Sequence, residues 1–525
     1  MVHQRQPSVI PPTFGRIGRI DVLVPVLAVV SFAVYLMHGT NGMLSRDQGV
    51  YAYAGQRFAS GVPPYQDILN RSGPLSHVLP GVAVWMGRPL GFADLHAMRI
   101  FYMACAVVTV CLIYLVGRDL FRSWAAGAVS AVVFLGFQGF IQYAANGPNP
   151  KVPMTMFIAL AFWAGLHRRW AWSGAYVALA TLCLQPSFFS TLATLVAAVL
   201  LLPNVPRVRA LVGIALGGSA TLSLCAFYFL TVGGLTQAYD DFWVINRSYT
   251  TPDSPLGNLP ARWTDFHKAY AASTVTILLG LTFLCLLGYR AFRARRHRTD
   301  DQSRFVLSLA IGAVAGLLWI CRDYDGWPDF FPLLPLCALG WAGVVRDLSE
   351  RFHPRRAVTV ATALVVAGIA FAGVATLNHR NDLLLQQERS VRAVFGALPG
   401  DATYISEEAP QPLVLTRRVN PALPQLYESG MTEYIDATWP GGISAYRQWV
   451  VAQKPTLIGQ GNPLPQAFRD SIEPQYAYIG CAPDMFWYAR RDLGAPKLAE
   501  LRRVATPRFG ANVGVTTGQC HNPEG

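Results

Sequence analysis

Long apolar segments recur along most of this chain, and they limit the folds that it can adopt. A helix needs about 20 residues to cross the hydrocarbon core of a bilayer, and eleven apolar runs approach that length. Backbone polar groups cannot stay unpaired in lipid, so these runs predict a polytopic α-helical membrane protein with about 11 transmembrane helices. The composition, 52% hydrophobic and 14% charged, excludes an ordinary soluble protein. The runs are 20–38, 96–117, 124–143, 152–167, 171–185, 187–202, 210–231, 271–289, 304–321, 329–345 and 357–377.

Arginine clusters in alternate loops predict the orientation of these helices. Cytoplasmic loops of membrane proteins carry an excess of Lys and Arg. If residues 1–19 are cytoplasmic, every even-numbered span ends at a basic loop on that same side. The net charge of +13 then reflects topology, and we expect no nucleic-acid partner. The loops contain Arg118 and Arg122, Arg168 and Arg169, Arg207 and Arg209, the arginines of 290–298 and those of 346–356.

The moderately apolar segment 73–89 fits this pattern only if it does not cross the membrane. Counting it as a span, or joining 171–202 into one span, would place basic loops outside. We therefore expect 73–89 to be an amphipathic helix in the outer interface. The protein is predicted to be a multi-pass plasma-membrane protein with a cytoplasmic amino terminus and a first outer loop at 39–95.

Residues 378–525 are predicted to form a separate extracytoplasmic α/β domain. A helical pattern covers 383–398, and it is followed by short strand-like pieces. Cys481 and Cys520 lie here, away from the apolar runs, and either a disulfide or two free thiols would fit their spacing. The strand-like pieces are 402–406, 413–416, 455–459 and 486–490.

Asp47 lies in the first outer loop, just beyond the first apolar run. It precedes a segment in which Val50, Tyr51, Ala54 and Phe58 share one helical face, which predicts a second interfacial helix over 48–60. Asp is a common N-cap, so one interpretation gives Asp47 a capping role. A carboxylate at the boundary between water and lipid headgroups also suits a catalytic base. Both interpretations remain open on these residues alone.

The order of motifs in the first loop resembles the GT-C superfamily of membrane glycosyltransferases. An acid begins an interfacial helix, then Gly61-Val-Pro-Pro-Tyr-Gln-Asp67 follows, and Asn70-Arg-Ser-Gly-Pro-Leu75 opens another helix. The chain looks closest to the branch of protein O-mannosyltransferases and lipid A aminoarabinose transferases. Gln185-Pro-Ser187 and the Phe-Phe-Pro-Leu-Leu-Pro run at 330–335 are also similar to that branch. The resemblance covers about residues 20 to 345 by topology.

The resemblance implies a GT-C-like catalytic domain at 20–377 and an inverting glycosyltransferase. The donor would be a sugar on a polyprenyl phosphate, and the acceptor a hydroxyl of a cell-envelope glycan, lipid or protein at the outer face. Asp47 matches the catalytic acid of the family. In relatives a Lys-Pro-Pro segment often contacts the donor phosphate, whereas this chain has Arg71-Ser-Gly-Pro-Leu. The predicted phosphate-binding residues are Arg71, Lys151, Arg247 and Arg322.

A second departure from the family lies in the short loop 144–151. Many relatives carry an acid there, and in some branches it helps to hold a divalent metal. This chain has Asn146 and Asn149, and amide oxygens are poorer ligands than carboxylates, so we expect no obligatory metal or other cofactor and leave a divalent metal open. A hydrogen-bonded turn explains the same Asn, Gly and Pro residues. The predicted acceptor- or sugar-binding residues are Asp67, Tyr65, His77, Asn146 and Asn149.

A transporter or lipid flippase is the alternative function, because it would also need many spans. Transport pathways usually place ionisable residues inside spans. The apolar runs here are nearly free of Asp, Glu and Lys, with Arg99 the main exception, and polar residues gather in the outer loops. That distribution favours an enzyme. A receptor built on the tail domain would leave the first-loop pattern unexplained.

Overall fold

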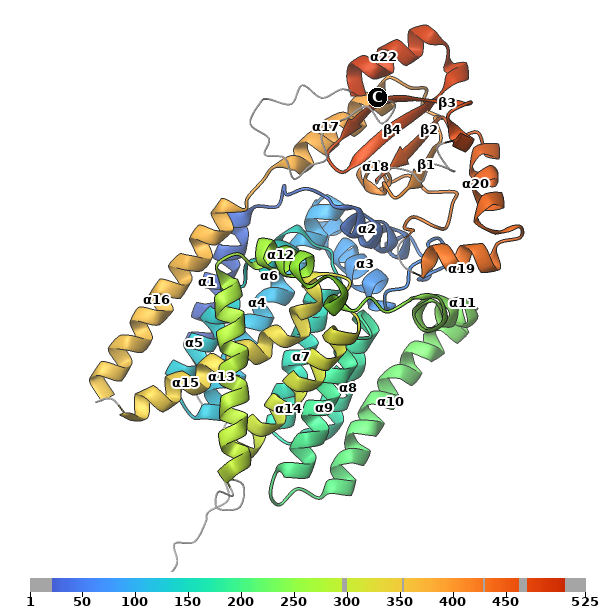
Figure 1. Ribbon diagram of the computed structural model, residues 1–525. Coiled ribbons are helices and arrows are strands. Elements are labelled where there is room, and N and C mark those ends of the chain that lie inside the picture. The colour runs from blue at the N-terminus through green and yellow to red at the C-terminus, as the bar shows by residue number, and fades with distance from the viewer. Residues whose placement is uncertain (1–20, 295–299, 352–353, 428–429, 462–469, 506–525) are drawn as a thin grey trace, which may run out of the picture.

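The computed structural model describes residues 21–294, 300–351, 354–427, 430–461 and 470–505. A bundle of long helices forms one part, and a small sheet with its covering helices forms the other (Figure 1). The bundle helices are α1 (Leu23–His38), α4 (Asp94–Phe121), α5 (Trp124–Leu135), α6 (Gln138–Asn146), α7 (Lys151–Leu166), α8 (Trp170–Cys183), α9 (Ser187–Leu201), α10 (Arg207–Thr231), α13 (Ser273–Ala294), α14 (Asp301–Arg322), α15 (Leu334–Arg351) and α16 (Pro354–Asn378).

The bundle has the length and hydropathy of a multi-pass membrane protein. Among the described residues, six helical stretches are long and apolar enough to cross a membrane. The peripheral helices α10 and α13 bury only 11% and 22% of their apolar windows, so most of their apolar surface faces outward, as lipid contact requires (Figure 1). Several other bundle helices, such as α1 and α9, are shorter than 18 residues. The total of eleven spans therefore stays a prediction.

The run expected as one span at 124–143 is two helices. α5 ends at Gly136 and Phe137 adopts an extended backbone, so α6 departs from α5 at an angle of 68°. Counted as one broken span, the pair would raise the six crossing helices to seven. The bend turns the end of α6 and the loop after it toward the end of the bundle that carries the sheet (Figure 1).

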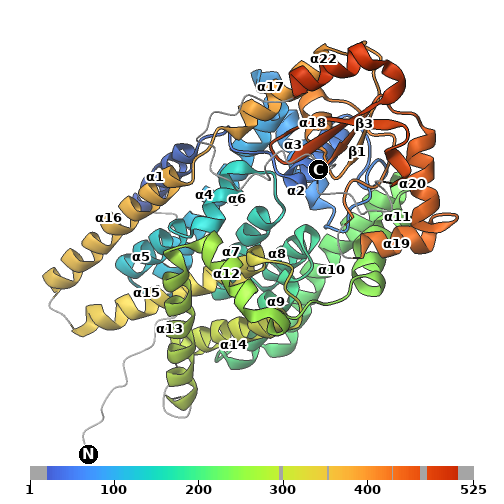
Figure 2. The ribbon, with the colours of Figure 1, turned by 45° about the horizontal axis from the view of Figure 1, so that its top comes forward.

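Short helices cover the end of the bundle nearest the sheet, which we call the domain side. α2 (Arg46–Ala59) and α3 (Leu75–Gly87) correspond to the helices expected at 48–60 and 73–89, and they lie between the bundle and the sheet (Figure 2). The remaining short elements here are α11 (Leu235–Tyr239), the π-helix η2 (Asp240–Tyr249), η3 (Pro255–Asn258), α12 (Leu259–Tyr270) and η4 (Trp327–Leu333).

The C-terminal part is an α/β domain around a four-stranded sheet of order β1-β2-β4-β3. β1 and β2 are parallel, whereas β4 is antiparallel to both β2 and β3. Trp487 of β4 is fully buried in the domain core. The elements are α17 (Leu383–Gly396), β1 (Tyr404–Glu407), α18 (Gln411–Thr416), α19 (Met431–Thr438), α20 (Gly442–Ala452), β2 (Leu457–Gln460), β3 (Tyr476–Ala482), β4 (Met485–Arg490), η5 (Arg491–Leu493) and α22 (Ala495–Ala505).

One sequence-based expectation for this domain is wrong, and one strand was missed. The strand expected at 413–416 is wrong, because these residues belong to α18. Pro412 lies in the first turn of that helix, where a backbone N–H would have no partner within the helix. A short apolar run does not by itself distinguish a strand from a helix. β3 was not anticipated. Cys481 on β3 is disulfide-bonded, and Cys520, its expected partner, lies outside the described residues.

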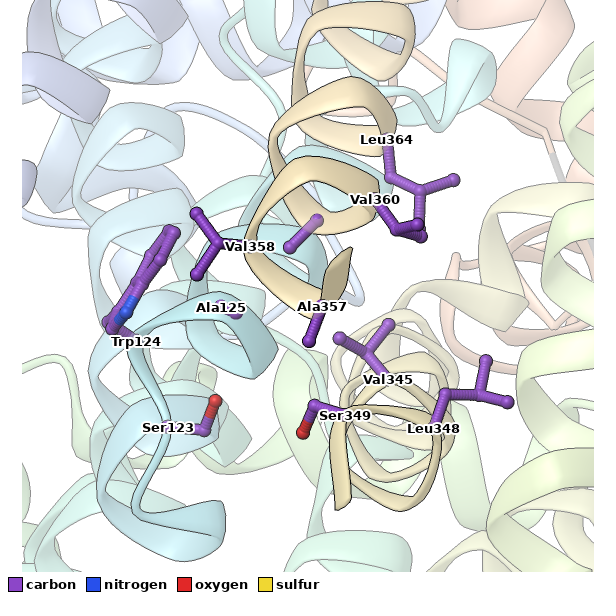
Figure 3. A pocket seen from close by; sticks show the side chains of 11 residues that line it. Ser123, Trp124, Ala125, Val345, Leu348, Ser349, Ala357, Val358, Val360 and Leu364 are labelled. Carbon is purple, nitrogen blue, oxygen red and sulfur yellow. The ribbon is translucent and has the colours of Figure 1, made fainter. Parts of the chain in front are cut away.

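A cavity of about 240 Å³ lies at the opposite end of the bundle, between α5, α15 and α16 (Figure 3). Apolar side chains such as Trp124, Val345 and Leu364 form most of its wall, together with Ser123 and Ser349. Its place at the far end of the bundle separates it from Asp47 and the other candidate site residues on the domain side.

Candidate active site

Asp47 lies in the first turn of α2, but it is not the residue that caps the helix. Ser45 is the N-cap: its side chain accepts from the backbone N–H of Gln48, and the Gln48 side chain accepts from the backbone N–H of Ser45. The capping interpretation of Asp47 is therefore wrong. Ser45-Arg-Asp-Gln48 has the spacing of a capping box, so this signal was present in the sequence. The Asp47 side chain is 42% exposed, and the Arg46 Nε lies 3.4 Å from its Oδ1.

Two carboxylates from the C-terminal domain join Asp47 at the start of α2. The backbone N–H of Arg46 donates to Oδ2 of Asp484 over 2.7 Å, and the Arg46 guanidinium lies 3.4 Å from Oε2 of Glu408. Burial raises the pKa of Asp484 to about 6, and the charge of Asp47 acts in the same direction. No local motif could reveal this group, because 438 residues separate Arg46 from Asp484.

Tyr51 connects the Asp47 helix to the segment that contains Arg71. It follows Asp47 by one helical turn, so both side chains lie on one face of α2. The Tyr51 hydroxyl and the Ser72 hydroxyl are 3.0 Å apart. The backbone oxygen of Arg71, next to Ser72, accepts from Nδ2 of Asn246 on η2 at 2.8 Å and from Nε2 of Gln185 at 3.4 Å. Side chains of α2, of η2 and of the loop between α8 and α9 therefore hold the 70–72 segment.

Arg71 and Lys151 belong to one network of alternating charges. Arg71 pairs with Asp325 at 2.9 Å, and Lys151 pairs with Asp329 at 2.9 Å. The backbone N–H of Asp325 donates to Asp329 over 2.8 Å, which links the two ion pairs. Arg322, at the end of α14 where this loop begins, lies over the Trp319 ring at 5.4 Å. The structure thus brings together three of the four predicted phosphate-binding cations, whereas Arg247 is exposed on η2 outside this network.

A third acid, Asp323, lies in the loop between α14 and η4, close to Asp325 and Asp329. Burial raises the pKa of Asp323, and the negative charges of Asp325 and Asp329 add to that shift while Arg71 and Arg322 oppose it. These five groups therefore interact electrostatically. We find no cluster of three metal-ligating side chains within the described residues.

Tyr65 and His77 are enclosed by the protein. Tyr65 is 1% exposed, donates its hydroxyl hydrogen to the Ser72 carbonyl over 2.8 Å and packs against the His77 ring. Burial lowers the pKa of His77 to about 3, so the ring is neutral, and it lies 3.2 Å from Nδ2 of Asn70. Their contact with an acceptor stays a prediction. In this structure Tyr65 contacts Ser72 and His77, within the segment that also carries Arg71.

The other predicted acceptor-binding residues are Asp67, Asn146 and Asn149. Asp67 and Asn149 bond to other residues of the protein, and Asn146 has a buried side-chain oxygen. Asp67 forms an ion pair with Arg57 of α2. Asn149 accepts from the backbone N–H of Lys151 over 2.9 Å at the start of α7, which fits the hydrogen-bonded turn better than a substrate contact. Asn146 differs, because its side-chain oxygen is buried without a hydrogen-bond partner in the described part of the chain. It lies against Gly42, where an added Cβ would be 2.0 Å from that oxygen.

Comparison with known proteins addresses the fold. No protein-family model and no curated protein sequence matches this chain. Among solved structures, ArnT from Cupriavidus metallidurans in the apo state superposes with a TM-score of 0.59 at 13% identity, over 93% of this chain and 99% of that chain. The chain therefore shares the fold of this ArnT. The same ArnT bound to undecaprenyl phosphate gives a TM-score of 0.58 at 14% identity, over 90% of this chain and 99% of that chain.

The structural likeness to ArnT extends further than the sequence motifs suggested. Topology and motifs pointed to residues 20–345, whereas 93% coverage must include much of the C-terminal domain. The domain that supplies Asp484 and Glu408 is therefore part of the shared architecture. Asp47 of α2, Arg71 just before α3 and Lys151 at the start of α7 all lie on the domain side of the fold.

Proposed function

We propose that this protein transfers a sugar from a polyprenyl-phosphate-linked donor to a hydroxyl acceptor, with inversion, at the outer face of the plasma membrane. The observation that carries the proposal is the contact that joins the helix of Asp47 to the segment of Arg71. The Tyr51–Ser72 contact brings the exposed carboxylate and Arg71 to one side of α2, and Asp325 and Asp329 extend that side to Lys151. The GT-C fold and a solved relative bound to undecaprenyl phosphate support a lipid-linked donor.

Asp47 is the proposed general base. Ser45 satisfies the capping need of α2, so the Asp47 carboxylate remains available to take a proton from the acceptor hydroxyl. The acceptor oxygen then attacks the anomeric carbon from the face opposite the phosphate. The bond between that carbon and the phosphate oxygen breaks with its electron pair on the phosphate, which inverts the centre.

Arg71 and Lys151 are the proposed contacts for the leaving phosphate. Fixed cations stabilise charge that develops in the transition state, because they need no reorientation when the reaction occurs. Arg71 is well suited to this role, since Asn246 and Gln185 hold its backbone and Asp325 orients its guanidinium. Arg322 at the edge of the same loop is a third candidate. The reaction as written requires no metal.

Arg99, the main ionisable residue within the predicted spans, argues against the alternative function of a transporter or flippase. Arg99 of α4 is fully buried, and its guanidinium donates to the backbone oxygens of Thr40 and Gly147 at 2.5 and 3.4 Å. It therefore joins the first loop to the 147 loop and does not line an open path. The sequence did not reveal this structural role.

The test is transfer of radiolabelled sugar from a panel of polyprenyl-phosphate sugars by the purified protein. General-base catalysis contributes roughly 10²- to 10⁴-fold, so Asp47→Asn should lose about that much activity while its thermal stability stays normal. Asp401→Asn, which removes an exposed carboxylate from the C-terminal domain, is the matched control and should stay active. An active, stable Asp47→Asn would disprove the role of Asp47. No transfer by the parent from any donor would contradict the enzyme proposal.

A further inference from the structure

The C-terminal domain holds the backbone immediately before Asp47. Leu44 is fully buried, and both of its backbone polar groups bond to one side chain, Gln387 of α17. The Leu44 N–H donates to Oε1 of Gln387 over 2.9 Å, and Nε2 of Gln387 donates to the Leu44 oxygen over 2.9 Å. The same Nε2 donates to the Pro483 oxygen over 2.9 Å. Gln387 therefore ties the first loop to the turn between β3 and β4.

Asp484, in that same turn, binds the backbone of Arg46, two residues after Leu44. It accepts from the backbone N–H of Arg46 over 2.7 Å and from Nε2 of Gln411 over 3.2 Å. The first N–H groups of a helix have no partner within the helix, so an acceptor from another domain stabilises its first turn. The Ser45 side chain accepts from the backbone N–H of Gln48, and the Asp484 side chain accepts from the backbone N–H of Arg46. The carboxylate of Asp47 is therefore not needed as the acceptor for either N–H group.

We propose that Gln387 and Asp484 are positioning residues for Asp47, so that the C-terminal domain is a working part of the active site. The catalytic consequence rests on the proposed function, whereas the structural consequence does not. Each residue holds a backbone atom within three residues of Asp47. Without these bonds the start of α2 frays and the carboxylate loses its orientation. A displacement of about 1 Å can cost roughly 10²-fold in rate.

Gln56 provides a matched control at the other end of the same helix. Its side chain is also buried and also bonds to the C-terminal domain, through Nε2 to the Val414 oxygen at 3.1 Å. It bonds in addition to Asp94 at 3.1 Å. Gln56→Ala therefore weakens domain docking as Gln387→Ala does, but it does so more than two helical turns from Asp47.

Hydrogen–deuterium exchange of the full-length protein tests the structural consequence without any substrate. Gln387→Ala and Asp484→Ala should speed exchange at residues 44–48, and Gln56→Ala should leave those amides as protected as in the parent. Unchanged protection in Gln387→Ala and Asp484→Ala would overturn the inference. Equal loss of protection in Gln56→Ala would also overturn it, because general undocking would then explain the result.

Kinetics test the catalytic consequence once a donor is known. Both alanine variants should lower kcat by roughly 10- to 100-fold with little change in KM for the donor, while Gln56→Ala keeps its kcat. Asp484→Asn retains an oxygen that accepts from Arg46, so it should recover most of the lost rate. If Asp47→Asn is inactive but Gln387→Ala and Asp484→Ala keep full kcat, the inference is wrong and the proposed function stands.

Discussion

At the scale of single residues, Glu407 is a buried acid of the C-terminal domain. It is 1% exposed at the end of β1, where the hydroxyls of Tyr427 and Tyr446 both donate to its carboxylate. Burial raises the pKa of Glu407 to about 8, and the neighbouring charge of Glu408 adds to the shift. Glu408 itself pairs with Arg46 beside Asp47. Glu407 is therefore an ionisable group next to Glu408, which contacts Arg46 in the candidate site.

Glu407 should make stability depend on pH. The unfolded glutamate loses its proton near 4.5, whereas the folded one keeps it to about 8. Between these values the folded state binds more protons, so the free energy of unfolding falls as pH rises. Glu407→Gln should flatten that fall in thermal unfolding measured from pH 5 to 8.5. Asp401→Asn should keep the slope of the parent, and parallel curves for Glu407→Gln and the parent would refute the assignment.

At the scale of elements, α10 depends on its packing against α8. α10 is mostly exposed, so this contact supplies much of its protein neighbourhood. The two helices approach closely at small residues: a Cβ on Gly217 would lie 1.8 Å from the Ala171 oxygen, and a Cβ on Gly174 would lie 1.9 Å from the Ile214 oxygen. Small residues allow such close approach between membrane helices, where van der Waals packing drives association.

The neighbouring glycines of α10 offer a direct test of this contact. Gly217→Ala forces the helices apart and should destabilise the protein by about 1 to 3 kcal/mol, the usual cost of overpacking. A Cβ on Gly218 would meet only ordinary contacts, at 3.5 Å from the Gly174 oxygen. Gly218→Ala should therefore be neutral or stabilising by up to roughly 1 kcal/mol, because alanine favours the helix. Thermal unfolding in detergent measures both, and equal effects would contradict the packing account.

At the scale of the whole molecule, the candidate site and the C-terminal domain lie on one side of the bundle, and the basic loops lie on the other. Arg118 and Arg168 belong to the latter loops, where Arg168 pairs with Asp301. The positive-inside bias predicts that this side faces the cytoplasm. The domain side, with Asp47, would then face outward.

Labelling of the native Cys321 thiol can test this orientation without the introduction of a new cysteine. It is an exposed free thiol near the end of α14 on the domain side. A membrane-impermeant maleimide should label it in intact cells. In a variant with Cys321→Ser, a cysteine placed at Glu350, which is 60% exposed at the opposite end, should label only after the membrane is permeabilised. The reverse pattern would show that the site faces the cytoplasm.

Much of this architecture follows from local sequence. Apolar runs predict helices because lipid forces each segment to satisfy its own backbone, and the helices appear near the predicted places. The first-loop helix α2, and Asp47 in its first turn, could also be predicted, because periodicity and capping act within a few residues. The bend between α5 and α6 and the helix at 411–416 were missed, since neither depends on hydropathy alone.

By itself the sequence determined that most of the apolar segments form helices and that an acid stands in the first turn of α2. Only the tertiary structure decided what surrounds that acid. Arg71 meets Asp325, Lys151 meets Asp329, and Arg46 meets Asp484, in pairs separated by 254, 178 and 438 residues. Such pairs depend on how helices pack and where the C-terminal domain docks. Local patterns do not record those distances, because side-chain contacts of this kind form only when the whole chain is folded.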